Sequence, residues 1–137
     1  MTQAMRMLET YPQSVGSIDR EDLTACIEEC IVCAQACVAC ADACLAEDAV
    51  ASLKTCIRAN LDCADLCDST GRILSRRTGE DFAIARAVVE ACMQACRACA
   101  TECEKHAEQH AHCAACANAC RRCEDACSTL LPQLTSG

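Results

Sequence analysis

Cysteine supplies most of the reactive side chains in this sequence, with 18 cysteines among 137 residues. The densest run is CIEECIVCAQACVACADAC, in which the cysteines follow one another in alternating steps of four and three residues. This spacing averages 3.5 residues, the period at which an α-helix presents one continuous stripe to a partner. Such a stripe normally holds leucine, isoleucine or valine, so its thiols predict a function that depends on sulfur. The run contains Cys26, Cys30, Cys33, Cys37, Cys40 and Cys44.

Three further groups of cysteines repeat the pattern, and the first of them is sparse. They are Cys56, Cys63 and Cys67, then Cys92, Cys96, Cys99 and Cys103, then Cys113, Cys116, Cys120, Cys123 and Cys127. His106 and His110 follow Cys103 with the same steps of three and four, and His112 comes directly afterwards. Imidazole is a metal ligand of intermediate softness. We therefore include the three histidines with all the cysteines as candidate metal ligands.

The expected metal follows from the ligand type and from its arrangement on helices. Residues three or four apart on a helix have Cβ atoms about 5–6 Å apart, so two thiolates at that spacing can bind one ion. Soft thiolates select Cu(I), zinc or iron–sulfur clusters. Zinc and iron–sulfur sites usually take small ligand sets from loops, whereas Cu(I) accepts two or three thiolates and can fill a long stripe site by site. The pattern favours multiple Cu(I) ions, with zinc or another d¹⁰ metal as the alternative.

Other uses of cysteine fit the sequence less well. A few buried cysteines would be ordinary small core residues, but regular stripes of them are not. Cysteines three or four apart within one helix are poorly placed to form disulfides. The sequence shows no Ser–His–Asp set and no glycine-rich phosphate loop, so we do not expect an enzyme.

The net charge of the chain and its first 15 residues indicate its cellular compartment and its possible partners. The first 15 residues lack the apolar segment of a signal peptide, so we expect the reducing cytoplasm, where thiols stay reduced. The net charge of −8 disfavours nucleic acid as a partner. We also expect no membrane partner, because charged residues interrupt the apolar runs before they reach the length of a membrane span, about 20 residues.

The positions of turn-forming residues predict the elements that carry these ligands. Tyr11-Pro12 ends a short helix over residues 2–10, and residues 14–17 form a linker. Long helices are expected over residues 18–46, 49–77 and 80–109, and a fourth begins at Cys113 and ends near Pro132. Thr78 with Asp81 resembles a capping box for the third long helix. The fold class is therefore all-α: residues 17–134 form an up-down-up-down antiparallel four-helix bundle lined by cysteines, and residues 1–16 add the short N-terminal helix and linker.

Up-down topology also predicts that the two ends of the bundle differ. Candidate ligands gather at one end, namely Cys44, Cys56, His106, His110, His112 and Cys113. Apolar residues gather at the other, namely Ile18, Leu74, Phe82, Val89, Leu130 and Leu134. We expect the first end to admit metal and the second to be closed.

From Cys26 to Cys127 the chain resembles the copper storage proteins, through CxxxCxxC runs at 26–33, 33–40 and 92–99 and CxxCxxxC at 113–120. The resemblance implies a four-helix bundle filled with Cu(I), usually a homotetramer. Because its first residues do not resemble a signal peptide, the chain is similar to the family's cytosolic branch. The resemblance implies that histidines at the open end of the bundle take part in copper uptake, and His106, His110 and His112 match these histidines by position. Asn60 interrupts the second stripe, which puts copper binding at that level in doubt.

Together these features predict cytosolic storage or sequestration of many Cu(I) ions. The alternatives are a chaperone that passes copper to a partner and a zinc buffer. Ile31, Val38 and Leu45 form a second stripe away from the cysteines, and such an exposed apolar stripe is typical of a subunit interface. Met1, Met5 and Met7 are either soft metal ligands or packing residues.

Overall fold

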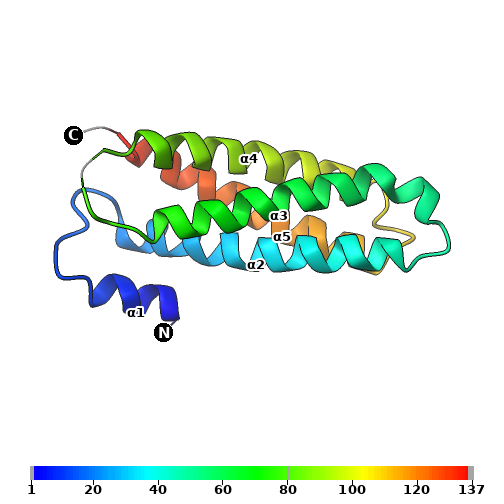
Figure 1. Ribbon diagram of the computed structural model, residues 1–137, viewed down its shortest axis with the longest axis horizontal. Coiled ribbons are helices and arrows are strands. Elements are labelled where there is room, and N and C mark those ends of the chain that lie inside the picture. Colours follow the sequence, from blue (N-terminus) through cyan, green and yellow to red (C-terminus); the bar gives the residue numbers. More distant parts are fainter. Residues whose placement is uncertain (1, 80, 136–137) are drawn as a thin grey trace.

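The computed structural model describes residues 2–79 and 81–135. A short helix, α1 (Gln3–Glu9), precedes four long ones: α2 (Arg20–Leu45), α3 (Lys54–Leu74), α4 (Ala83–Glu104) and α5 (Ala111–Leu130). Two 3₁₀ turns, η1 (Val50–Leu53) and η2 (Leu131–Gln133), precede α3 and follow α5. The long helices run up, down, up and down along one axis (Figure 1). The predicted all-α fold class is confirmed.

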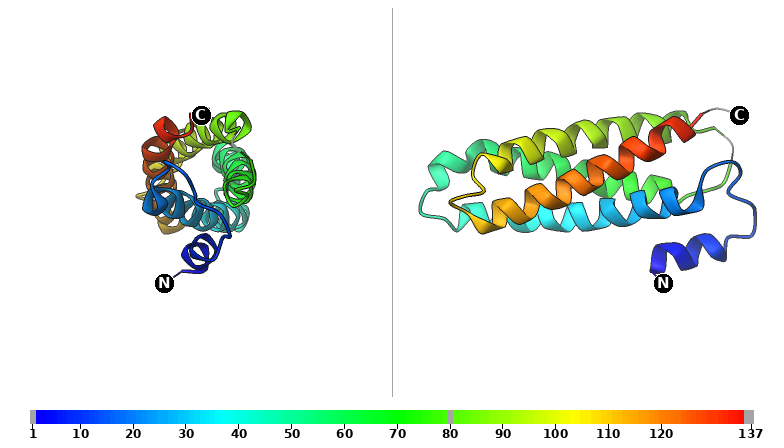
Figure 2. Two further views of the ribbon diagram at one scale, coloured as in Figure 1. Left: turned by 90° about the vertical axis from the view of Figure 1, so that its left-hand side faces the viewer. Right: turned by 180° about the vertical axis from the view of Figure 1, so that it is seen from behind.

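Each long helix packs against two neighbours. Helix α2 packs against α3 and α5, and α4 packs against the same two helices. Seen along the axis, the four helices surround a central core (Figure 2). Helix α1 lies outside this square against α2. Because every long helix has two neighbours, the side chains that face the axis meet those of the other three helices.

At the start of each helix that begins at the end near the termini, an aspartate side chain accepts a backbone hydrogen bond, and for α2 this aspartate is the N-cap. The Oδ1 atom of Asp19 accepts a hydrogen bond from the Asp22 backbone N–H at 2.9 Å, and Glu21 and Asp22 place negative charge in the first turn of α2. Before α4, Asp81 Oδ1 accepts from the Ala83 backbone N–H at 2.9 Å. The expected capping box of Thr78 with Asp81 was wrong: the N-cap of α4 is Phe82, and the Thr78 hydroxyl lies 3.4 Å from the hydroxyl of Tyr11.

Two of the long helices end earlier than predicted. Helix α3 ends at Leu74 rather than near residue 77, and α4 ends at Glu104 rather than near residue 109. After α4 the chain tightens into turns: the His106 N–H donates to the Cys103 carbonyl, and the His110 N–H donates to the His106 carbonyl, both at 3.0 Å. His106 and His110 therefore belong to the α4–α5 connection and do not extend the helical stripe.

The end that contains the α3–α4 connection is closed by hydrocarbon, and we call it the sealed end. Its fully or almost fully buried residues are Ile18, Leu23, Leu74, Val89, Leu130 and Leu134. Phe82, which was expected among them, is only partly buried because it stands at the rim, before the first turn of α4. Gln133 joins η2 to the start of α2, accepting from the Asp19 N–H and donating to Asp22 Oδ2, both at 2.8 Å.

Helix α2 is long and apolar enough to cross a membrane by length and composition alone. The earlier expectation that no segment reaches this length was therefore wrong. The apolar character comes largely from cysteine and alanine, and the cysteines of α2 face the bundle core. In this fold α2 is a core helix.

Candidate metal site

Every cysteine is a free thiol buried inside the bundle. Each of the 18 side chains is at most 2% exposed. They come from all four long helices, because the steps of three and four place one face of each helix toward the axis. The prediction that cysteine side chains line the core of the bundle is confirmed.

Near the sealed end, sulfur atoms of different helices lie close together. The Sγ atom of Cys26 is 3.8 Å from that of Cys127, and the Sγ of Cys123 is 3.8 Å from that of Cys30. Four sulfur atoms there lie within 4.8 Å of one another, those of Cys30, Cys92, Cys123 and Cys127. A zinc–sulfur bond is about 2.3 Å long, so sulfur atoms at these separations can share one metal ion.

In the middle of the core the groups of four share members. The Sγ of Cys33 lies 3.9 Å from those of Cys37 and Cys63 and 3.7 Å from that of Cys120, and these four form one group. Each also belongs to a second group, either Cys33, Cys63, Cys67 and Cys96 or Cys37, Cys99, Cys116 and Cys120. A thiol here borders more than one possible site, which suits a ligand that bridges metal ions.

The outermost group of sulfur atoms is Cys40, Cys44, Cys56 and Cys113. The Sγ of Cys56 lies 3.5 Å from that of Cys103, which connects this group with the middle of the core. Burial raises the pKa of the Cys113 thiol to about 12 and raises the pKa of Cys44, in both cases with added repulsion from Cys56. These two thiols are therefore protonated at neutral pH, and a metal ion that binds them displaces a proton.

Asn60 occupies the position in α3 where the stripe lacks a cysteine. It is fully buried, and its Oδ1 atom accepts hydrogen bonds from the thiols of Cys99 at 3.0 Å, Cys116 at 3.3 Å and Cys103 at 3.5 Å. Its Nδ2 atom lies 3.9 Å from the Sγ of Cys56. Asn60 is thus a polar core residue, and neighbouring thiols provide the hydrogen-bond partners of its side-chain amide.

The three histidines lie together at the end opposite the sealed one, which we call the histidine end. Only His112 contacts the thiols in the described part of the chain: its Nδ1 atom is 3.4 Å from the Sγ of Cys40 and 3.6 Å from that of Cys113. The rings of His110 and His112 have centroids 5.6 Å apart. The Nε2 atom of His106 lies 3.9 Å from a carboxylate oxygen of Glu102.

Glu47 is a site residue that the sequence did not reveal. It follows α2, and its Oε2 atom lies 2.5 Å from Nδ1 of His110 and 3.0 Å from Nε2 of His112. The hydrogen bond with His112, and secondly that with His110, holds the pKa of Glu47 below its ordinary value. Its partners are 63 and 65 residues away in the sequence, so no local motif indicates the contact.

The three methionines left open as ligands or packing residues lie away from the thiols or outside the described residues. The Sδ atom of Met5 accepts a hydrogen bond from the Thr24 hydroxyl at 3.8 Å on the outer side of α2. The Met7 side chain is exposed on α1. Met1 lies outside the described residues. Met5 therefore acts as a packing residue here.

Comparison with known proteins gives one family. Residues 19–132 match the sequence profile of the family described as copper storage protein. No curated protein sequence matches the chain significantly.

Solved structures agree with this match. The copper storage protein Ccsp from Streptomyces lividans, loaded with 10 copper equivalents, is 54% identical with a TM-score of 0.93, over 95% of this chain and 98% of that one. A variant of Ccsp with two histidines replaced by alanine is 55% identical, with a TM-score of 0.84 over 85% and 98% of the two chains. A Streptomyces lividans cytosolic copper storage protein with five coppers is 56% identical, with a TM-score of 0.80 over 82% and 93%. The chain belongs to the copper storage protein family.

Proposed function

We propose that this protein stores Cu(I) in the cytosol by exchanging the protons of its 18 buried thiols for copper ions. The observation that carries the proposal is the continuous set of free sulfur atoms along the core, from Cys26 to Cys56, each of which lies within 4.8 Å of a neighbour. The cytosolic location of the Streptomyces lividans relative supports the same compartment here. Residues 17–134 would form the storage domain, with residues 1–16 as an appendage. Storage requires no catalytic step, so we propose that the protein is not an enzyme.

Burial and sharing of the thiols favour storage of copper over the two alternatives. A chaperone needs an exposed site that a partner can reach, whereas the exposure of every cysteine here is at most 2%. A zinc buffer needs four ligands for each ion. Because the groups around Cys33 and Cys37 share members, separate tetrahedral sites could not all be filled at once. Cu(I) takes fewer thiolates and accepts bridging sulfur, so it can use the whole set.

The number of ions follows from charge balance in a buried site. Each bound thiol loses a proton, so the exchange of one H⁺ for one Cu⁺ leaves the core neutral. Isolated sites with two thiolates would leave one negative charge at each copper, and unpaired buried charge is costly. Bridging thiolates avoid this cost, because each sulfur contacts two ions and each ion two sulfurs. We expect roughly 18 Cu(I) per chain, with a few more if histidines also bind.

A titration of the reduced protein with Cu(I) against a competing chelator tests this function. Saturation near one ion for each cysteine supports it. Saturation at half that number indicates independent two-thiolate sites, and a quarter indicates tetrahedral chemistry of the zinc type. A parallel competition between Cu(I) and Zn(II) decides which metal the core prefers, and displacement of bound copper by zinc would contradict the proposal.

We also propose that copper is taken up at the histidine end. The Nδ1 atom of His112 lies beside Cys40 and Cys113, so one ion could contact the imidazole and a thiolate together. Imidazole holds Cu⁺ less tightly than bridging thiolates do, so His106, His110 and His112 can bind an incoming ion and release it inward.

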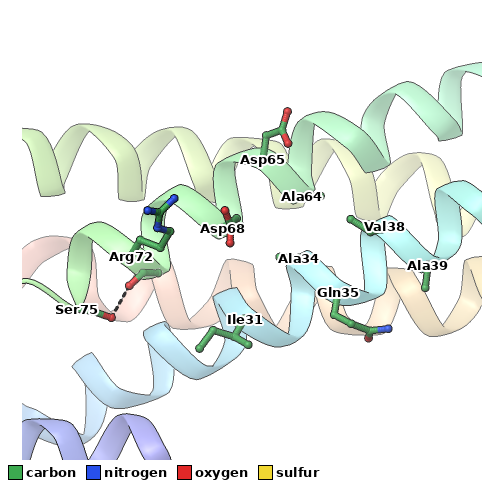
Figure 3. A pocket seen from close by; sticks show the side chains of 11 residues that line it. Ile31, Ala34, Gln35, Val38, Ala39, Ala64, Asp65, Asp68, Arg72 and Ser75 are labelled. Atoms are coloured by element: carbon green, nitrogen blue, oxygen red, sulfur yellow. Dashed lines mark hydrogen bonds between the residues drawn. The ribbon is translucent and has the colours of Figure 1, made fainter.

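The apolar stripe expected at an oligomer interface is exposed on the outer side of α2. Ile31, Val38 and Leu45 are 60%, 55% and 60% exposed. Ile31 and Val38 border a groove of about 620 Å³, whose other side contains Asp68 and Arg72 of α3 (Figure 3). We propose that this face joins copies of the chain in a homo-oligomer, a tetramer as the family resemblance implies.

Sedimentation of a Val38→Asp variant tests the interface. A buried carboxylate would disfavour association, so the sedimentation coefficient should fall to that of a smaller assembly. Ile84→Asp is the matched control, since Ile84 is 70% exposed on α4, away from the groove. If the wild type already sediments as a monomer, or if only Ile84→Asp dissociates it, this face is not the interface.

A further inference from the structure

Glu47 connects the two chain segments that close the histidine end. It belongs to the α2–η1 connection, while His110 and His112 belong to the α4–α5 connection and to the first turn of α5. One oxygen atom, Oε2, lies within hydrogen-bonding distance of both imidazoles, 2.5 Å from His110 Nδ1 and 3.0 Å from His112 Nε2. The Glu47 side chain is 32% exposed, so it stands at the boundary between solvent and the core.

The chemistry of this contact determines which nitrogen of His112 carries the proton. An ionised carboxylate can only accept hydrogen bonds, so the nitrogen that faces it must be an N–H. For His112 that nitrogen is Nε2. In a neutral ring the other nitrogen then has a free lone pair, and Nδ1 is the atom that faces the thiols of Cys40 and Cys113. The carboxylate thus directs the lone pair of His112 into the core.

His110 contacts the same oxygen through its other nitrogen. Its Nδ1 atom faces Glu47, so Nδ1 carries the proton and Nε2 has the lone pair. One carboxylate therefore selects opposite tautomers in the two rings. Without it, each ring would distribute between both tautomers, and a fraction of His112 would present an N–H to Cys40.

We propose that Glu47 is a positioning residue for copper uptake, which fixes the tautomer and orientation of His112 so that Nδ1 is ready to bind an incoming Cu(I). The inference rests on the proposed uptake at the histidine end. Carboxylates that hydrogen-bond the second nitrogen of a ligating histidine orient the ring and raise its basicity, and their loss typically lowers metal affinity or activity 10–100-fold. Glu47 itself contributes no bond to copper in this role.

The experiment compares three substitutions of Glu47 with a control substitution that removes one negative charge from the neighbouring residue, Asp48. Glu47→Ala removes the acceptor, Glu47→Gln keeps the size but allows an N–H to face a histidine, and Glu47→Asp keeps the carboxylate. Asp48→Asn is the control, since Asp48 is the next residue, is exposed and carries the same charge. The first measurement is the ¹⁵N NMR spectrum of the imidazole nitrogens in reduced, metal-free protein. The second is stopped-flow uptake of the first equivalents of Cu(I).

In wild type and Asp48→Asn, His112 should give the signature of a protonated Nε2 and an unprotonated Nδ1. Glu47→Ala and Glu47→Gln should shift it toward a tautomer mixture and slow the uptake by 10–100-fold, with saturating copper unchanged. Glu47→Asp should restore part of both signals. A purely structural tie between the two connections would slow uptake without changing the tautomer, and that result would overturn the proposal.

The inference is also wrong if Glu47→Ala and Asp48→Asn slow uptake equally, since charge alone would then explain the effect. Circular dichroism and the amide NMR spectrum establish that each variant is folded, and Glu47→Gln decides the matter if the alanine variant is not. Failure of the storage proposal gives a different result, namely a wild-type protein with low copper capacity. The tautomers, measured without copper, still test the role of Glu47 in that case.

Discussion

The two ends of the bundle are formed by the same four helices but contain different kinds of residue. At the sealed end, Leu23, Leu74, Val89, Leu130 and Leu134 are at most 1% exposed. At the histidine end, Glu47, His106, His110 and His112 are all partly exposed, and His112 contacts both a carboxylate and two thiols. One end thus consists of close-packed hydrocarbon, and the other of polar groups that can bind ions and exchange protons with solvent.

If copper enters at the histidine end as proposed, this difference should separate stability from uptake. Thiols are small, and a core of them buries less hydrocarbon than a core of leucine would. The leucines at the sealed end make up part of that loss without occupying the metal-binding part of the core. The histidine end also contains a buried leucine, Leu53 in η1, so this end is not entirely polar. Changes at the two ends should therefore affect different measurements.

The largest effect is expected from Leu130→Ala at the sealed end. Leu130 is fully buried, and truncation of a buried leucine typically lowers the free energy of unfolding by about 2–5 kcal/mol. Denaturant unfolding of the reduced, metal-free protein measures this, with Ile84→Ala as the exposed control. The rate of copper uptake should stay unchanged. A faster uptake in Leu130→Ala would indicate that copper enters through the sealed end.

Asn60 lies between the two ends, and its substitution should have the next largest effect. Asn60→Ala leaves the thiols of Cys99, Cys103 and Cys116 without their acceptor, and loss of a buried hydrogen-bond partner costs about 1–3 kcal/mol. Unfolding of the metal-free protein again gives the value, and Asn118→Ala on the exposed side of α5 is the control. Equal stabilities of the two variants would mean that the amide–thiol contacts contribute nothing.

A double substitution, His106→Ala with His110→Ala, tests the histidine end directly. We expect uptake and chelator-driven removal of copper to slow roughly tenfold, equivalent to about 1.4 kcal/mol, while capacity changes by only a few ions. Stopped-flow kinetics and equilibrium titration separate the two quantities. Phe82→Ala, at the rim of the sealed end, is the comparison variant. If Phe82→Ala alters the rate and the histidine pair does not, the proposed entrance is at the wrong end.

The fold and the thiol core could be predicted because they depend on a local repeat. Steps of three and four residues determine which side of a helix a cysteine occupies, and short connections determine that the helices are antiparallel. The same repeat led to an error at its end. His106 and His110 continue the spacing in sequence, but the backbone leaves the helix after Glu104, so they do not share the face of Cys99 and Cys103.

Contacts between distant segments could not be predicted in this way. Glu47 is one of 20 acidic residues, and nothing in its neighbours distinguishes it. Its role depends on two connections meeting at one end of the bundle. Asn60 was recognised as an interruption, but only the structure shows that the amide oxygen is surrounded by three thiols. Phe82 was placed in the sealed end by its type, although its position at the rim leaves it partly exposed.

The smallest effect is the share of the pH dependence of stability that two thiols at the histidine end contribute, beside thiols deeper in the core such as Cys37 and Cys96, whose pKa is also raised. Burial raises the pKa of Cys113 from 9.0 to about 12 and also raises the pKa of Cys44. As the pH rises above 9, the unfolded chain loses these protons while the folded chain keeps them, so the unfolded state gains. Their contribution to stability is complete below about pH 9 and is lost progressively as the pH approaches 12.

Unfolding of the reduced, metal-free protein at about pH 8 and about pH 10.5 measures the loss. A variant with both Cys44→Ala and Cys113→Ala should show a smaller loss than wild type, whereas Leu130→Ala should be destabilised equally at both pH values. An undiminished loss in the double cysteine variant would mean that Cys44 and Cys113 contribute nothing and that the thiols deeper in the core account for the whole pH dependence.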